Sequence, residues 1–149
     1  MKIVILEDNE ERRALMRTWL QDRFYQFDVR FFDTARDTIE FLDVHLEDTI
    51  LICLDHDLEM QPGQNGTWID PGTGRDVADY LATKSPHCPV VIHSTNSDAV
   101  LGMKMALQDA GWKTKRVVPF DDLEWISSCW FPTIRRVIVD AARPAVAKD

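Results

Sequence analysis

The chain has 149 residues, 45% of them hydrophobic, which fits one domain with a single core. Its formal net charge of −8 disfavours binding to the phosphate backbone of duplex nucleic acid. No apolar run reaches the ~20 residues that cross a membrane, and the start of the chain lacks a secretory pattern. We therefore expect a cytoplasmic protein without membrane contact.

Short apolar runs typical of strands alternate with helical patterns along the chain. Strands are predicted over 3–6, 27–32, 50–54, 89–92 and 114–118, and helices over 9–24, 35–46, 74–84 and 97–110. Asp8 and Glu11 have the spacing of a capping box for the first helix, and Pro132 must kink or split a last helix that follows Asp121. Alternating strands and helices predict a flavodoxin-like α/β fold with a doubly wound, five-stranded parallel sheet of order 2-1-3-4-5. We expect one domain over residues 1–142 and a flexible tail over 143–149.

Polar residues follow three strands that this topology places side by side. They are Glu7-Asp8, then Asp55-His56-Asp57, then His93-Ser94-Thr95-Asn96. Ligands of such sheets bind beyond the carboxyl ends of the strands, so these residues form the predicted site.

Carboxylates at adjacent strand ends repel one another unless a cation neutralises them. Asp8 alone could be only a helix cap, but Glu7, Asp8 and Asp55 together favour a metal site. Hard divalent cations take oxygen ligands, so Mg²⁺ is the expected cofactor and Mn²⁺ the alternative.

Several of these residues resemble the motifs of response-regulator receiver domains. The resemblance rests on Leu6-Glu7-Asp8-Asn9, Leu54-Asp55, Gly74, Ser94 and Pro119-Phe120. It implies that Asp55 is a phospho-accepting aspartate and that Ser94 is a switch residue.

Other positions depart from an ordinary receiver. Val118 stands where the family has a lysine that grips the phosphoryl group. Lys115 and Arg116 lie short of the end of the predicted strand, whereas Lys104, on a predicted helix, stays open as a substitute. The stretch from Asp55 to Gly74 is also longer than usual. With Leu54–Leu58, Gly72-Thr73-Gly74, Asp76 and His93–Asn96, the chain resembles the cyclic-phosphate-processing receiver family, a divergent branch of the receivers.

That resemblance and the two histidines predict phosphoester chemistry. His56 and His93, beside Asp55, could take a proton from water and protonate the leaving oxygen, since imidazole does both near neutral pH. Ser94, Thr95 and Asn96 offer hydrogen bonds to phosphate oxygens. Thr73 and Gly74 open a helix whose N–H groups favour an anion.

The expected function is that of a metal-dependent phosphoesterase acting on a small cyclic phosphate, either a cyclic nucleotide or a 2′,3′-cyclic phosphate end. One alternative is a stand-alone receiver phosphorylated on Asp55, and another is a degenerate receiver that only binds a partner or ligand. If His56 were only a surface loop residue and His93 only a hydrogen-bonded core residue, these alternatives would be favoured.

Aromatic residues outside the site suggest two further features. Trp68 and Ile69 could form a lid that stacks on a base, or could anchor their long loop to the body. Trp112, Trp125, Trp130 and Phe131 are expected to be mostly core, with some exposed near the last strand and helix, where the receiver resemblance implies a homodimer.

Overall fold

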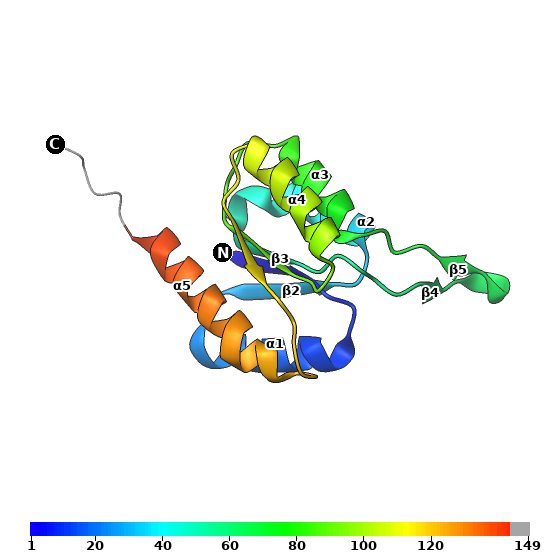
Figure 1. Ribbon diagram of the computed structural model, residues 1–149, viewed down its shortest axis with the longest axis horizontal. Coiled ribbons are helices and arrows are strands. Elements are labelled where there is room, and N and C mark those ends of the chain that lie inside the picture. Colours follow the sequence, from blue (N-terminus) through cyan, green and yellow to red (C-terminus); the bar gives the residue numbers. More distant parts are fainter. Residues whose placement is uncertain (144–149) are drawn as a thin grey trace.

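The computed structural model describes residues 1–143 and has a central parallel sheet between two helical layers (Figure 1). The sheet order is β2-β1-β3-β6-β7, which confirms the predicted 2-1-3-4-5 topology. The strands are β1 (Lys2–Leu6), β2 (Asp28–Phe32), β3 (Thr49–Leu54), β6 (Val90–His93) and β7 (Thr114–Val117). The fold is therefore the predicted flavodoxin-like, doubly wound α/β fold.

Five helices cover the sheet, α1 and α5 on one face and α2, α3 and α4 on the other (Figure 1). Their bounds are α1 (Glu10–Arg23), α2 (Ala35–His45), α3 (Gly74–Ala82), α4 (Ser97–Asp109) and α5 (Phe131–Ala142). Because successive strand residues point to opposite faces, each central strand feeds both cores. Ile3 and Ile5 pack toward α1 and α5, whereas Val4 and Leu6 pack toward α2 to α4. Each such buried side chain contributes about 1.5–3 kcal/mol.

The long stretch after Asp57 forms an arm instead of an unstructured loop. Strands β4 (Gln61–Pro62) and β5 (Trp68–Ile69) pair antiparallel around a tight turn at Gln64–Gly66. The arm projects away from the helical layers (Figure 1). Trp68 is 67% exposed and Ile69 51% exposed, so neither anchors the loop to the body.

Two local expectations need correction. The N-cap of α1 is Asn9, whose Oδ1 accepts a hydrogen bond from the Arg12 N–H at 2.9 Å, so the predicted cap at Asp8 is wrong. Asp8 instead turns to the arm, as described below. The expectation that some of Trp112, Trp125, Trp130 and Phe131 are exposed is also wrong, because all four are buried.

The last helix confirms the predicted disturbance around Pro132. One π-helical turn, Ile126–Trp130, leads directly into α5, and Pro132 lies in the first turn of α5. A proline is tolerated there because the first N–H groups of a helix have no intrahelical partner.

The described part of the chain contains no helix long and apolar enough to span a bilayer. Of the predicted tail, only Arg143 is described, and residues 144–149 lie outside the described residues.

Candidate metal and phosphate site

Three side chains meet at the carboxyl ends of the central strands. Glu7 follows β1, Asp55 follows β3 and His93 ends β6, and the parallel register pairs Leu6 with Leu54 and Leu54 with Ile92. One oxygen or nitrogen from each of Glu7, Asp55 and His93 lies within 4.8 Å of the other two. All three residues are buried. Two carboxylates and an imidazole in this arrangement could hold a metal ion.

The three residues share one face of the sheet. They continue the inward rows of Ile5, Cys53 and Val91, which pack with Trp125 in the core between the sheet and α1 and α5. The His93 and Trp125 rings stack with their centroids 5.7 Å apart. The aromatic contact holds the imidazole in place at the rim of this core.

Glu7 is held as a carboxylate. Its Oε1 lies 3.2 Å from His93 Nε2, and its Oε2 accepts a hydrogen bond from the Asn9 N–H at 3.0 Å. Burial raises the pKa of Glu7, but His93, the Asn9 N–H and Arg12 together outweigh burial and lower the pKa to about 2. Glu7 is therefore negatively charged at neutral pH.

Asp55 is shifted the other way. Burial, with a smaller contribution from the charge of Glu7, raises the pKa of Asp55 to about 6, against the lowering effects of His93, the His56 N–H and Arg12. Such opposed shifts in adjacent carboxylates are typical of sites where one group exchanges a proton or a cation near neutral pH.

Asp8 lies outside the group of three. Its Oδ2 accepts a hydrogen bond from the Glu59 N–H at 2.6 Å, which joins the end of β1 to the base of the arm. Burial raises the pKa of Asp8, and the charge of Glu7 adds to this effect. A surface hollow of about 400 Å³ opens here, lined by Asp8, Asp33, Glu59, Met60, Gln61 and Pro62. Metal binding by Asp8 stays a prediction.

The two histidines have different surroundings. The His56 N–H donates to Asp55 Oδ1 at 2.7 Å, and His56 Nδ1 lies 2.9 Å from Asp57 Oδ1. The His56 side chain is 16% exposed, whereas that of His93 is fully buried. His56 can therefore exchange protons with solvent more readily than His93.

The predicted phosphate-binding residues have structural partners of their own. Ser94 Oγ accepts from the Asn96 N–H at 3.0 Å, and Asn96 caps α4 by accepting from the Ala99 N–H at 3.1 Å, while Thr95 is exposed. The Thr73 N–H donates to Asp76 Oδ2 at 3.0 Å at the start of α3. Their binding of phosphate stays a prediction.

Gly74 is required by packing against the site. Its N–H donates to the His56 carbonyl at 3.0 Å, and a Cβ on Gly74 would collide with the Asp55 carbonyl oxygen. The glycine thus lets α3 start directly against the Asp55-His56 backbone, which fixes the position of both residues.

Sequence reasoning missed Arg12. This arginine lies in the first turns of α1, and its Nη1 is 3.4 Å from Glu7 Oε1 and 3.8 Å from Asp55 Oδ2. Its position five residues after Glu7 places it near the start of the first helix, but does not show on which side of that helix its side chain lies.

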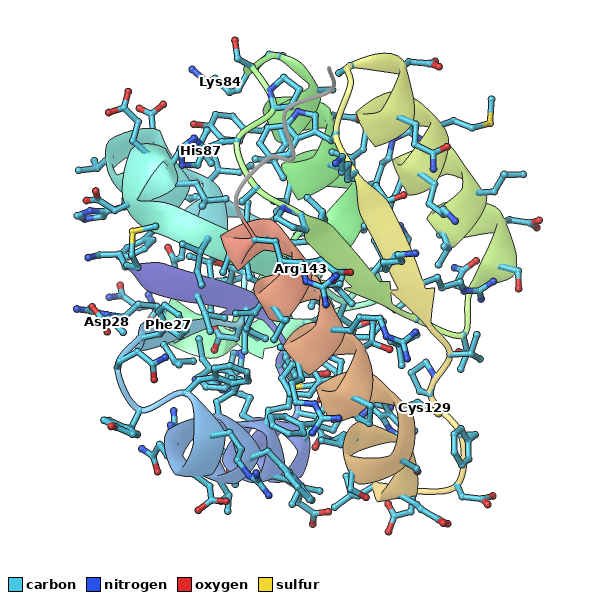
Figure 2. All side chains as sticks on the ribbon, turned by 90° about the vertical axis from the view of Figure 1, so that its left-hand side faces the viewer. Phe27, Asp28, Lys84, His87, Cys129 and Arg143 are labelled. Atoms are coloured by element: carbon cyan, nitrogen blue, oxygen red, sulfur yellow. The ribbon has the colours of Figure 1, made fainter. Side chains whose placement is uncertain are left out.

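The opposite edge of the sheet, where the strands begin, carries none of the predicted site residues. Figure 2 shows the molecule from that side, with His87 and Arg143 facing the reader. His87 is exposed, and its Nε2 lies 2.8 Å from the Glu47 carbonyl oxygen.

The fold and the acidic strand ends define a receiver-like protein. Solved receivers agree with this over almost the whole chain. The phosphorylated cyanobacterial phytochrome response regulator RcpA has a TM-score of 0.70 at 19% identity, with 97% of this chain and 98% of that chain covered. The signal receiver domain of a putative Luxo repressor protein from Vibrio parahaemolyticus has a TM-score of 0.65 at 17% identity, covering 94% and 91%.

The Mn²⁺-bound form of the response regulator Rcp1 is also similar, with a TM-score of 0.59 at 18% identity over 89% of this chain and 95% of that chain. A search of curated protein sequences found no match. The family model of the cyclic-phosphate processing receiver domain matches residues 2–109. The chain belongs to this family, as its motifs predicted.

Proposed function

We propose that this protein is a metal-dependent phosphoesterase that opens a small cyclic phosphate by hydrolysis. The observation that carries the proposal is the buried group of Glu7, Asp55 and His93, whose donor atoms lie within 4.8 Å of one another at the ligand-binding edge of the sheet. The family to which the chain belongs supports the choice of a cyclic phosphate.

A divalent cation held by these three residues would polarise the phosphoryl oxygen and lower the pKa of a water molecule. An imidazole nitrogen is a better ligand for Mn²⁺ or Zn²⁺ than for Mg²⁺, which takes mainly oxygen ligands. We therefore favour Mn²⁺, the expected alternative to Mg²⁺, and add Zn²⁺ to the candidate ions. The buried position of His93, against both Glu7 and Trp125, supports a ligand role more than a role in proton transfer.

His56 is the residue that we assign to proton transfer. Hydrolysis forms a bond from a water oxygen to phosphorus and breaks one ester bond, so a proton leaves the water and a proton reaches the departing oxygen. The Asp57 carboxylate accepts a hydrogen bond from His56 Nδ1, which orients the ring and leaves Nε2 for the reaction. His56 Nε2 carries out one of the two proton transfers, and solvent takes or supplies the proton of the other.

Our candidate for the binding site of the rest of the substrate is the hollow between Asp8 and the base of the arm. Asp8 directly follows Glu7 in the sequence, and the exposed Trp68 and Ile69 lie on the same arm. In the proposal, the arm stacks on the base of a nucleotide whose phosphate reaches Asp55.

The test is incubation of the protein with 2′,3′-cyclic and 3′,5′-cyclic mononucleotides and cyclic dinucleotides in Mg²⁺, Mn²⁺ or Zn²⁺, followed by chromatography of the products. Ring-opened monoester that is lost in His56→Ala and reduced in His93→Gln supports the proposal. Absence of turnover in every metal, or turnover unchanged in both variants, refutes it. Labelling of Asp55 by acetyl phosphate without turnover would identify a phospho-accepting receiver instead.

A further inference from the structure

Arg12 is the cation nearest to the carboxylates of the site among the described residues. Its Nη1 is 3.4 Å from Glu7 Oε1 and 3.8 Å from Asp55 Oδ2. Its guanidinium lies over the Trp125 ring, 5.2 Å from the centroid. Trp125 also stacks on His93, so one buried ring positions both the imidazole and the guanidinium.

The basic residues near the end of β7 serve other contacts. Val118, which stands at the position of the receiver lysine, is 49% exposed. Arg116 points to the other face of the sheet, where its Nη2 donates to the Ser94 carbonyl at 3.1 Å and to Ser97 Oγ at 3.2 Å. Lys115 is exposed on β7. Neither Arg116 nor Lys115 takes the place of the missing lysine at Glu7 and Asp55.

Arg12 keeps capacity for a ligand. Within residues 1–143, Glu7 is the only acceptor of a hydrogen bond from its side chain, and the side chain is 28% exposed. A guanidinium has five N–H donors in a planar fork that matches two oxygens of a phosphate. The remaining donors are therefore not used in hydrogen bonds within the described residues, and the contacts with Glu7 and Trp125 fix the position of the guanidinium.

The charges point to the same role. Glu7 and Asp55 carry two negative charges when both are ionised, which a divalent cation would balance. Within the described residues, Arg12 is the one Lys or Arg side chain within 4.0 Å of these two carboxylates, so its positive charge would remain beside the bound cation. A cyclic phosphate is a diester with one negative charge, so the charge of Arg12 matches it.

We propose that Arg12 binds the phosphate of the substrate and so takes over, from α1, the part that a lysine after the last strand plays in ordinary receivers. The inference rests on the proposed function in taking a phosphate as the ligand. It concerns binding, however, and can be tested without turnover.

The experiment measures binding of inorganic phosphate by calorimetry in saturating Mn²⁺, and binding of Mn²⁺ alone, for the wild type and three variants. Arg12→Gln removes the charge, Arg12→Lys keeps it, and Arg13→Gln is the matched control. Arg13 is the next residue on α1, but its guanidinium lies 5.7 Å from the Phe31 ring centroid, away from the carboxylates.

Arg12→Gln should weaken phosphate binding about tenfold to a hundredfold, the effect of one charged hydrogen-bonding group. Its affinity for Mn²⁺ should be unchanged or higher, because a competing positive charge is gone. Arg12→Lys should lose less, and Arg13→Gln should behave as the wild type. A loss of phosphate binding without a loss of Mn²⁺ binding would not arise from a loss of structure alone.

The inference is overturned if the wild type binds no phosphate or if Arg12→Gln binds it as the wild type does. It is also overturned if phosphate and Mn²⁺ binding fall together in Arg12→Gln and Arg12→Lys. Phosphate binding that depends on Arg12 in a protein without turnover would leave this inference standing and remove the proposed function. Turnover by a protein whose phosphate binding does not depend on Arg12 would leave the proposed function standing and overturn this inference.

Discussion

His93 Nε2 lies 3.2 Å from Glu7 Oε1, and both side chains are fully buried. The two residues come from β6 and β1, which do not pair directly, so the contact spans the end of β3 between them. Asp55 at the end of β3 completes the group. The buried group therefore adds a nitrogen donor to the carboxylates of Glu7 and Asp55.

The first prediction concerns metal preference. His93→Gln keeps a polar group against Glu7 but removes the imidazole, so affinity for Mn²⁺ and Zn²⁺ should fall about tenfold or more, with a smaller change for Mg²⁺. Calorimetric titration with each ion measures this. An equal loss for all three ions would show that His93 acts only through the structure of the site.

The second prediction concerns pH. The pKa of Asp55 rises from 3.8 to about 6 on folding. Its contribution to the free energy of unfolding is therefore fully present below pH 3.8 and is lost as the pH rises to about 6. The loss is on the order of 3 kcal/mol. The pKa of Glu7 falls from 4.5 to about 2, so its contribution is present above pH 4.5 and is lost as pH falls toward 2. The free energy of unfolding of the metal-free protein should therefore contain a rise with pH up to about 4.5 and a fall between about 4 and 6.

Urea unfolding across this pH range measures both contributions. Asp55→Asn should flatten the fall between pH 4 and 6, whereas Asp109→Asn, a change at an exposed carboxylate on α4, should leave it. Added Mn²⁺ should stabilise the wild type more at pH 7 than at pH 5, because protons compete for Asp55. A fall that persists unchanged in Asp55→Asn would contradict the assignment.

The third prediction separates proton transfer from metal binding. His56→Ala should lower kcat about 10²- to 10⁴-fold, the usual contribution of a general acid or base, with Mn²⁺ affinity unchanged. His87→Ala, at the opposite edge, should have no effect (Figure 2). If His56→Ala instead abolished Mn²⁺ binding, His56 would belong with the ligands.

The fourth prediction concerns Gly74. A methyl group there would strike the Asp55 carbonyl oxygen, so Gly74→Ala should lower the free energy of unfolding by about 1–3 kcal/mol and weaken Mn²⁺ binding. Gly102→Ala on α4 is the matched control, since its Cβ meets only the flexible end of Arg75. That control should be neutral or stabilising because alanine favours a helix over glycine. Thermal and urea unfolding of both variants give the comparison.

The fifth prediction concerns the arm. Trp68 is largely exposed, so Trp68→Ala should leave Tm unchanged and raise KM for a nucleotide substrate about fivefold or more, the loss expected for one stacking contact. Unchanged KM would show that the arm does not touch the base.

The fold and the positions of all three buried site residues followed from simple rules. Polar residues after alternating apolar strands predicted the converging ends, and with them Glu7, Asp55 and His93. The sequence analysis expected His93 as a proton-transfer residue, but its place beside Glu7 and Asp55 in the buried group could also have been predicted, because residues of a strand alternate between faces. Glu7, Asp55 and His93 continue the rows of Ile5, Cys53 and Val91, whereas Asp8 does not.

Arg12 could not be placed in the same way. Its contact with Glu7 and Asp55 depends on the rotation of α1 about its own axis and on Trp125, which arrives from the far end of the chain. The pairing of β4 with β5 in the arm could not be predicted either. Gly- and Pro-rich turns between 59 and 73 do not specify which short segments pair.

The most direct test of the account is a ³¹P NMR time course of a 2′,3′-cyclic mononucleotide with the wild type in Mn²⁺, in excess EDTA, and with Asp55→Asn in Mn²⁺. If the protein is a metal-dependent phosphoesterase, the cyclic diester signal will be replaced by a monoester signal only with the wild type in Mn²⁺. Conversion at the same rate in EDTA or in Asp55→Asn, or no conversion of this or any other cyclic phosphate, would contradict it.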